Sequence, residues 1–197
     1  RVMATALDYK HEYLGHTQHL VITPLTERCQ RILLNAMVEG LGGCVQGPSG
    51  TGKSETVKDL AKMVAVQCVV FSCSADLTLR TATRLLMGLA STGAWSCLDE
   101  FNRLNLSLLS VIAQMILTIQ VATRSKDDKV VLDGTNLRLI DSVCVFITIN
   151  PNFKGRAVMP DNLKALFRRV AISKPDAKRI AHVLLASSGY ETAESLS

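Results

Sequence analysis

Short runs of apolar residues alternate along the chain with longer stretches in which apolar residues recur every three or four positions. A short continuous apolar run is typical of a buried strand, and the longer period indicates a helix with one buried face. We therefore predict strands over residues 44–46, 68–72, 94–98, 143–149 and 169–172. We predict helices over residues 53–66, 77–89, 106–122 and 161–167. Two more begin at Thr23-Pro24 and after Lys174-Pro175, and the first of these is closed by Leu41-Gly42-Gly43.

Strands that alternate with helices of this length predict an α/β fold built from βαβ units. The sheet is expected to be mostly parallel, with helices on both faces and a ligand site at the carboxyl ends of its strands. The run 143–149 is continuous and β-branched, as expected at the centre of such a sheet. The helix 106–122 is apolar nearly all round, which predicts deep packing, and residues 130–139, broken at Gly134, predict a β-hairpin.

The organisation expected along the chain is a large α/β subdomain between two less complete segments. Residues 1–19 are mixed and polar and are expected to form a linker-like stretch. Residues 20–173 are expected to form the large subdomain, and residues 174–197 the start of a small helical lid that is cut short. The chain begins with Arg1 and ends in a helix-like segment, so we interpret it as a piece of a longer protein.

Composition and charge narrow the possible partners. The chain has 197 residues, of which 48% are hydrophobic and 20% charged, with a formal net charge of +5. This charge suits an anionic ligand, but the 5% of aromatic residues and the lack of a long Lys/Arg run argue against a nucleic-acid surface. We predict no signal peptide and no membrane span.

The cysteines and histidines form no pattern typical of a metal site. The six cysteines contain no C-x-x-C pair, and most sit inside apolar runs, which predicts buried free thiols in a reducing compartment. The histidines at 11, 16 and 19 lie in a polar stretch and are expected to be solvated rather than ligating.

The strongest chemical signal is an eight-residue motif that matches the G-x-x-x-x-G-K-[ST] pattern of a phosphate-binding loop: Gly47-Pro48-Ser49-Gly50-Thr51-Gly52-Lys53-Ser54. The glycines allow a tight curl whose N–H groups point at phosphates, and the following helix aims its positive end at the same anion. Lys53 can reach the outer phosphates, and Ser54 offers a hydroxyl to Mg²⁺. The alternative is a glycine-rich turn with a solvated lysine.

Two further polar groups follow predicted strands. Asp99 and Glu100 follow the strand 94–98, where Asp99 is placed to hold Mg²⁺ and Glu100 to take a proton from an attacking water. Asn150 follows the strand 143–149, where its amide can contact the γ-phosphate and the attacking water. A surface turn is the alternative for the acidic pair, and an Asn-Pro turn is the alternative for Asn150.

These features together resemble an AAA+ ATPase, and specifically the first AAA+ module of a dynein heavy chain, of the axonemal rather than the cytoplasmic type. The resemblance covers about residues 9–190. Besides the loop and its following helix, it rests on Leu20 to Thr26, Gly93-Ala94-Trp95 with Asp99 to Arg103, Phe146-Ile147-Thr148 with Asn150-Pro151, and Pro160 to Arg168. The sequence departs from the family pattern at Leu98 and at residues 152–156, which bears on the subtype.

The resemblance implies an ATP-binding and ATP-hydrolysing module of a microtubule motor, with ATP and Mg²⁺ as cofactors. It implies that Lys53 and Ser54 are the Walker A lysine and hydroxyl, Asp99 and Glu100 the Walker B pair, and Asn150 sensor I. The segment Leu20, Val21 and Ile22 matches the part that packs on adenine. Arg168 matches an arginine finger that would face a different neighbour, and Lys164 shares its predicted helix face.

The same resemblance implies partners and a location. The partners are neighbouring AAA+ modules of the same heavy chain, microtubules through parts outside this fragment, and dynein intermediate and light chains, with no nucleic acid and no membrane. The location is the cytoplasm and cytoskeleton, in the axoneme of a cilium or flagellum. A non-catalytic module that holds nucleotide as a structural or regulatory element remains the alternative, and a nucleic-acid-directed AAA+ machine or a GTPase is disfavoured.

Overall fold

The computed structural model describes residues 7–15, 19–74, 77–151 and 160–190. Its helices are α1 (Pro24–Val38), α2 (Lys53–Val64), α3 (Leu79–Thr92), α4 (Leu106–Ser125), α5 (Asp161–Ala165) and α6 (Ala177–Ser187), with a 3₁₀ turn, η1 (Phe101–Arg103). Its strands are β1 (Gly42–Gln46), β2 (Cys68–Ser72), β3 (Trp95–Asp99), β4 (Lys129–Leu132), β5 (Thr135–Arg138), β6 (Cys144–Ile149) and β7 (Phe167–Ala171).

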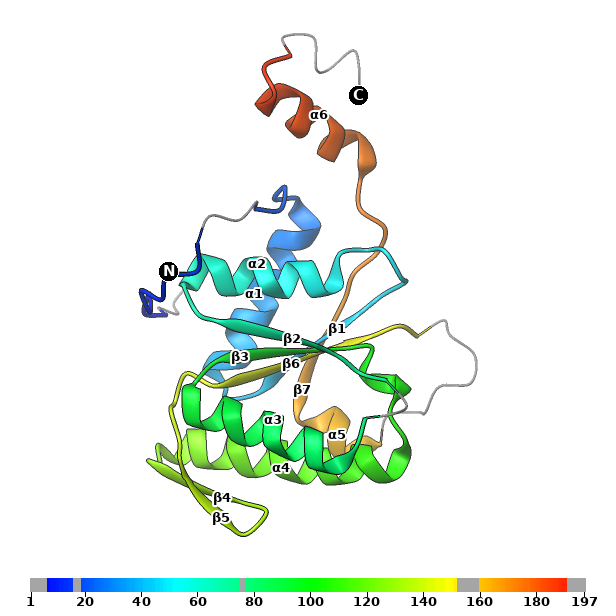
Figure 1. The fold of residues 1–197 in the computed structure, drawn as a ribbon. Coiled ribbons are helices and arrows are strands. Elements are labelled where there is room, and N and C mark those ends of the chain that lie inside the picture. The colour runs from blue at the N-terminus through cyan, green and yellow to red at the C-terminus, as the bar shows by residue number, and fades with distance from the viewer. Residues whose placement is uncertain (1–6, 16–18, 75–76, 152–159, 191–197) are drawn as a thin grey trace.

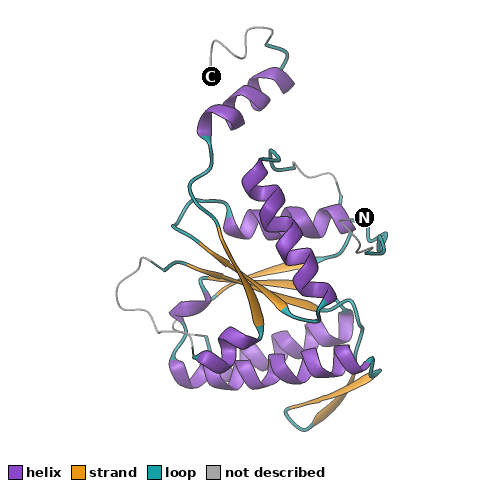
Figure 2. Cartoon of the chain, turned by 180° about the vertical axis from the view of Figure 1, so that it is seen from behind, coloured by secondary structure: helices purple, strands orange, loops and turns teal. Residues whose placement is uncertain are grey.

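Within the described residues, five strands form one sheet in the order β2-β3-β6-β1-β7, and every pair in it is parallel. The helices α1 and α2 cover one face of this sheet, and α3 and α4 cover the other (Figure 1; Figure 2 shows the same layers from behind). Strand β6 is buried along its whole length. The predicted α/β fold, the parallel sheet and the central place of this strand are therefore confirmed.

The core is divided by the sheet into two apolar layers. On the side of α1 and α2, Trp95 and Phe146 pack with their ring centroids 5.3 Å apart, beside buried Leu33 and Leu60. On the other side, Phe101 and Ile116 lie in the layer formed with α3 and α4. The hairpin of β4 and β5 has the predicted turn at Asp133-Gly134 and packs against α3 and α4.

The first helix and first strand differ in their boundary from the sequence prediction. Thr23 caps α1 as expected, with its hydroxyl accepting from the N–H of Thr26, but the helix ends at Val38 and β1 already begins at Gly42. We predicted Gly42 and Gly43 to close the helix. They belong instead to the strand, because a Cβ on Gly42 would collide with the ring of Phe167 and one on Gly43 with Leu33.

Helix α4 is less deeply packed than its sequence predicts. Its inner face is buried against the sheet and α3, while Leu106, Val111, Leu117 and Val121 are exposed. Among the described helices α4 alone has the length and composition that would suit a membrane span, and 44% of its most apolar stretch is buried inside the fold. Such one-sided burial is the packing of a core helix beside a sheet.

The expected helix around Lys164 and Arg168 is shorter than predicted, and the two residues do not share a helix face. Helix α5 ends at Ala165, and Arg168 lies on β7, where it pairs with Glu39 at 2.7 Å. Lys164 pairs with Asp161 at 2.6 Å. The chain leaves the helix early because residues 167–171 extend alongside β1 as an edge strand of the sheet.

The two ends of the described chain attach differently. Residues 7–15 form no helix or strand, but the N–H of Lys10 donates to the carbonyl of Val64 at 3.0 Å and ties this stretch to the end of α2. Helix α6 begins at its cap Asp176 and extends away from the sheet, with no buried residue of its own (Figure 1). Parts of the predicted linker (1–6, 16–18) and lid (191–197), and residues 152–156, lie outside the described residues.

Candidate active site

The predicted site residues follow strands β3, β6 and β1, which are consecutive neighbours in the sheet. The phosphate-loop motif follows β1, Asp99 ends β3, and Asn150 follows β6. Because parallel strands end at the same edge, the fold carries all three groups to one side of the sheet. The N–H of Gly47 donates to the carbonyl of Ile149 at 3.1 Å, which joins the start of the loop directly to the end of β6.

The loop between β1 and α2 has the tight curl that its glycines predict. Gly50 and Gly52 have φ angles of +75° and +80°, a backbone region that favours glycine. Gly47 is required for a different reason, because a Cβ there would collide with the carbonyl oxygen of Ile172 beyond β7. The loop is therefore confined between its own turn and a neighbouring strand.

Lys53 is the first residue of α2 and folds back over the loop. Its Nζ donates to the carbonyl of Pro48 at 2.7 Å, and the hydroxyl of Thr51 donates to the same oxygen at 2.9 Å. The side chain is only 8% exposed. The ammonium group is thus held at the loop, at the N-terminal end of α2, where the helix dipole favours an anion.

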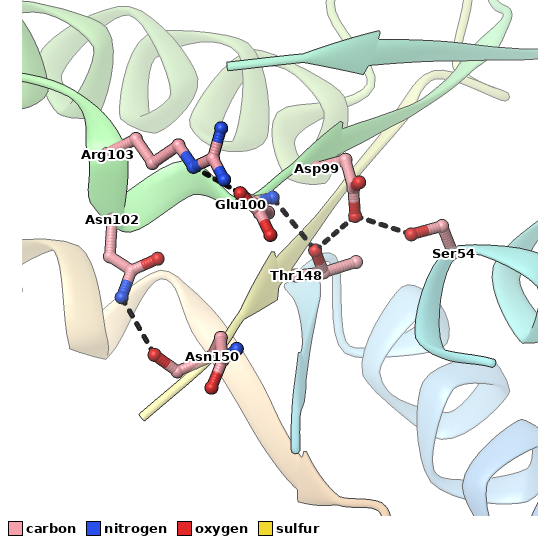
Figure 3. Close-up of polar contacts among 7 residues, drawn as sticks. All are labelled: Ser54, Asp99, Glu100, Asn102, Arg103, Thr148 and Asn150. Carbon is pink, nitrogen blue, oxygen red and sulfur yellow. Dashed lines mark hydrogen bonds and ion pairs between the residues drawn. The ribbon is translucent and has the colours of Figure 1, made fainter. Parts of the chain in front are cut away.

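The acidic pair and Ser54 meet across the gap between β3 and α2. The hydroxyl of Ser54 donates to Oδ1 of Asp99, and the hydroxyl of Thr148 donates to the same oxygen at 2.6 Å (Figure 3). The N–H of Glu100 donates in turn to the Thr148 hydroxyl at 3.0 Å. The loop helix, β3 and β6 are therefore connected at this point by a continuous chain of hydrogen bonds.

Glu100 stands at a sharp bend in the backbone. Its φ of +53° and ψ of +44° place it in the left-handed region, which is costly for a side chain with a Cβ. The bend ends β3 and starts η1, so that the Asp99 and Glu100 carboxylates point in different directions (Figure 3). Asp99 points to Ser54, whereas the Glu100 carboxylate forms an ion pair with Nε of Arg103.

Asn150 follows β6 and is 5% exposed. Its backbone carbonyl oxygen accepts from Nδ2 of Asn102 at 3.1 Å, and this bond connects η1 to the end of β6 (Figure 3). The structure thus brings Asn150 to the same sheet edge as Asp99 and Glu100.

A cleft of about 300 Å³ opens at this edge. It is lined by loop residues and by both acidic residues; the lining is Ser49, Gly50, Gly52, Lys53, Ser54, Glu55, Lys58, Val70, Asp99 and Glu100. Asn150 lies outside this lining. The cleft joins two lysines and the backbone of a glycine-rich loop to three carboxylates, those of Glu55, Asp99 and Glu100. Cationic groups and backbone N–H groups beside carboxylates are the combination that a phosphate chain with a divalent cation needs.

The segment Leu20, Val21 and Ile22 lies before α1 and is attached to α2 through Asp59. The Asp59 carboxylate accepts from the N–H of Leu20 at 3.3 Å and contacts Nδ1 of His19 at 3.0 Å. Ile22 is 59% exposed, so an apolar side chain remains accessible on this segment. His19 was expected to be solvated; it remains largely exposed but has a carboxylate partner.

The residues at the cleft fit a magnesium ion. The Ser54 hydroxyl and the Asp99 carboxylate are hard oxygen donors that already contact each other across the cleft. Among the described residues there is no group of three or more His, Cys, Asp or Glu side chains that could hold a metal by themselves. Mg²⁺ commonly binds through one or two carboxylates together with substrate phosphates, so a single carboxylate and a hydroxyl suffice.

The Cys73 thiol lies beside Asp99 and favours its protonated form. Burial, and to a smaller extent the neighbouring Asp99 carboxylate, raises the pKa of Cys73 to about 12. The N–H of Cys73 also donates to the carbonyl of Asp99 at 2.9 Å. A thiol reacts as its thiolate, and this raised pKa disfavours the thiolate of Cys73.

Thr148 and Asp59 were not identified from the sequence. Thr148 is a hydroxyl inside an otherwise apolar, fully buried strand, and Asp59 is a carboxylate on the buried face of α2. A polar side chain at a position whose pattern predicts burial is a usable signal, because such groups need a partner. The sequence does not reveal which partner each of them has.

The comparisons with known proteins identify the family of the chain. The sequence model of a family described as the hydrolytic ATP binding site of dynein motor region matches residues 9–197. Dynein axonemal heavy chain 12 of Mus musculus is 51% identical over 197 residues, and dynein axonemal heavy chain 3 of Homo sapiens is 50% identical over 196 residues. Both alignments cover 100% of this chain, but only 6% and 5% of those relatives.

A solved structure supports the fold alone. A putative ATPase from Cytophaga hutchinsonii superposes with a TM-score of 0.62 at 17% sequence identity, covering 88% of this chain and 54% of that chain. The predicted fold class and the predicted resemblance are both confirmed. The chain belongs to the dynein family, as the AAA+ ATPase module that forms the hydrolytic ATP-binding site of the motor region.

Proposed function

We propose that the chain uses the cleft at residues 47–54, Asp99 and Glu100 to bind Mg²⁺-ATP and hydrolyse it, as a module of an axonemal dynein heavy chain. The observation that carries this proposal is the direct contact between Ser54 on α2 and Asp99 on β3, at the mouth of a phosphate-binding loop. A glycine-rich turn without a ligand has no need of a carboxylate facing its hydroxyl.

The loop binds the phosphates of ATP through its backbone N–H groups, and Lys53 neutralises charge on the outer phosphates. Ser54 and Asp99 hold Mg²⁺, which shields the phosphate oxygens and the charge that develops on them during transfer. The exposed face of the segment Leu20, Val21 and Ile22 packs against adenine. These contacts position the substrate, and positioning is the larger part of catalysis in phosphoryl transfer.

Glu100 acts as the general base. In this role its carboxylate takes a proton from the water that attacks the γ-phosphorus, and a carboxylate one residue beyond the metal ligand is well placed to do so. Asn150 contacts the γ-phosphate and the same water through its side-chain amide. The ion pair with Arg103 holds the Glu100 carboxylate in one orientation.

The finer parts of this proposal concern the whole heavy chain. We propose that hydrolysis here drives movement along microtubules in the axoneme of a cilium or flagellum. The partners are neighbouring AAA+ modules of the same heavy chain and dynein intermediate and light chains. The identity of about 50% to axonemal heavy chains supports these assignments.

Replacing Lys53 tests the binding step. In the heavy chain that carries this sequence, Lys53→Ala should weaken binding of a fluorescent ATP analogue in the presence of Mg²⁺ by at least tenfold, because the buried ammonium group is lost from the loop. The matched control is Lys62→Ala, in the last turn of the same helix, which should bind as the wild-type does. Equal affinity of the Lys53 variant and the wild-type would contradict the proposal.

A further inference from the structure

We propose that Thr148 is the positioning residue that aligns the metal ligand and the general base with each other. This inference rests on the proposed function, because it assigns a role toward Asp99 and Glu100. Thr148 sits on β6, two residues before Asn150, and is completely buried. Its hydroxyl contacts both members of the acidic pair, Asp99 through the carboxylate and Glu100 through the backbone N–H.

The hydrogen-bonding capacity of this hydroxyl is used in both directions. Its one proton is donated to Oδ1 of Asp99 at 2.6 Å, and one lone pair accepts the N–H of Glu100 at 3.0 Å. The bond to Asp99 is charge-assisted, so it is both short and strong. The hydroxyl therefore fixes the carboxylate of one residue and the backbone of the next.

Each of these bonds has a distinct effect on the cleft. The hydroxyls of Thr148 and Ser54 both donate to Oδ1 of Asp99, so the bond from Thr148 holds the carboxylate facing Ser54. The bond from Glu100 stabilises a residue with a φ of +53°, a conformation that disfavours an ordinary side chain. That bend separates the directions of the two carboxylates. Loss of the hydroxyl would therefore disturb metal binding and base alignment together.

The backbone ladder between β3 and β6 ends before the acidic pair, although Asp99 still pairs with Ser72 of β2. The parallel register of β3 and β6 pairs Leu98 with Ile147, and Asp99 and Glu100 lie beyond the last paired residues. Asp99 and Glu100 are thus at the point where strand pairing with β6 stops. Beyond the last backbone pair, the Thr148 side chain connects β6 to the end of β3 through its bonds to Asp99 and Glu100.

Two substitutions separate the hydroxyl from the shape of the side chain. Thr148→Val keeps the branched shape and removes the hydroxyl, while Thr148→Ser keeps the hydroxyl and removes a methyl group. In the heavy chain, we expect Thr148→Val to raise the Mg²⁺ concentration for half-maximal binding of a fluorescent ATP analogue by about tenfold, from loss of one charge-assisted bond. We expect kcat to fall by at least tenfold as well, and Thr148→Ser to restore most of both values.

Hydrogen exchange gives a readout that does not depend on activity. The Glu100 amide should exchange slowly in the wild-type and in Thr148→Ser, and much faster in Thr148→Val, because its acceptor is gone. Rapid exchange of this amide in the wild-type would overturn the proposal, even if the valine variant does not fold. Equal Mg²⁺ dependence and kcat in folded Val and Ser variants would overturn it too.

The test distinguishes this inference from the proposed function. If the wild-type binds no ATP, or if Lys53→Ala binds it normally, the proposed function fails and the role of Thr148 fails with it. If the wild-type binds and hydrolyses ATP but the valine variant matches the serine variant, only the positioning role is overturned.

Discussion

At the scale of single residues, the site depends on glycines, which have no side chain, as much as on residues with polar side chains. Gly47 has no Cβ, and this absence lets the phosphate loop pass beside the carbonyl of Ile172. The contact is with backbone of the neighbouring strand end rather than with a flexible side chain, so the structure cannot absorb an added methyl group locally. The loop would have to move instead.

Gly47→Ala should therefore lower the free energy of unfolding by about 1–3 kcal/mol, as overpacking does, and weaken ATP binding. The matched control is Gly88→Ala in the middle of α3, where an added Cβ meets nothing within 4 Å. That variant should gain about 0.5–1 kcal/mol from helix propensity and bind ATP normally. For each variant, urea unfolding measures the free energy of unfolding and nucleotide titration measures the affinity for ATP. A Gly47→Ala protein as stable as the wild-type would show that the added Cβ does not collide with Ile172.

Some residues of the site can be predicted from the sequence, and others cannot. The loop, Asp99, Glu100 and Asn150 were predicted because each has a fixed place relative to a motif or a strand end. Thr148 and Asp59 were missed because their importance comes from contacts across 49 and 40 positions, to Asp99 and His19. A local pattern carries no information about a partner so far along the chain.

At the scale of elements, Asp59 attaches the segment before α1 to the helix that follows the phosphate loop. Its carboxylate is 3% exposed and accepts from the side chain of Gln30 at 3.4 Å as well as from the N–H of Leu20. A carboxylate on α2 therefore determines where the proposed adenine-binding segment lies relative to the proposed phosphate site.

Asp59→Ala should lower the free energy of unfolding by about 1–3 kcal/mol, because its buried partners lose their acceptor. It should also weaken binding of ATP more than binding of inorganic triphosphate, since only the nucleotide contacts the detached segment. Asp127→Ala, at an exposed position after α4, is the control and should change neither. The assignment of the segment to adenine is refuted if both ligands are weakened equally.

Element boundaries were predicted less well than element types. The helix predicted over residues 161–167 ends at Ala165 in the structure. It ends early because residues 167–171 form a ladder of hydrogen bonds beside β1. Gly42 and Gly43 look like a helix terminator in sequence, yet they lie in β1 because only glycine fits beside Phe167 and Leu33. In both cases tertiary contacts outweighed the local preference.

At the scale of the whole molecule, the core carries an unusual number of thiols. Five of the six cysteines are buried, and all are free. Burial raises the pKa of Cys29 from 9.0 to about 12 and that of Cys44 to about 11, and it raises the pKa values of Cys97 and Cys144 as well. The thiolate is disfavoured because the apolar surroundings cannot solvate its charge.

These raised pKa values predict that stability is lost at alkaline pH. Between about pH 9 and pH 12 the unfolded Cys29 thiol releases its proton while the folded one keeps it, so the folded state binds more protons. Stability is then fully present below pH 9 and falls as pH rises, by about 1.4 kcal/mol per pH unit for each such thiol.

Urea unfolding under reducing conditions from pH 8 to pH 11 measures this loss. Cys29→Ala should unfold with a shallower dependence on pH than the wild-type, because one ionising group has been removed. The comparison of the two slopes isolates the thiol from lysines and tyrosines that titrate in the same range. Identical slopes would show that the Cys29 thiol does not contribute.

The proposed mechanism depends on Glu100 being the base in a cleft that binds Mg²⁺-ATP. Single-turnover ATP hydrolysis by the heavy chain with Glu100→Gln tests this most directly, with Glu27→Gln, at an exposed position of α1, as the control. We predict that Glu100→Gln binds ATP as tightly as the wild-type and hydrolyses it at least about a hundredfold more slowly. Hydrolysis by this variant at the wild-type rate would contradict the account.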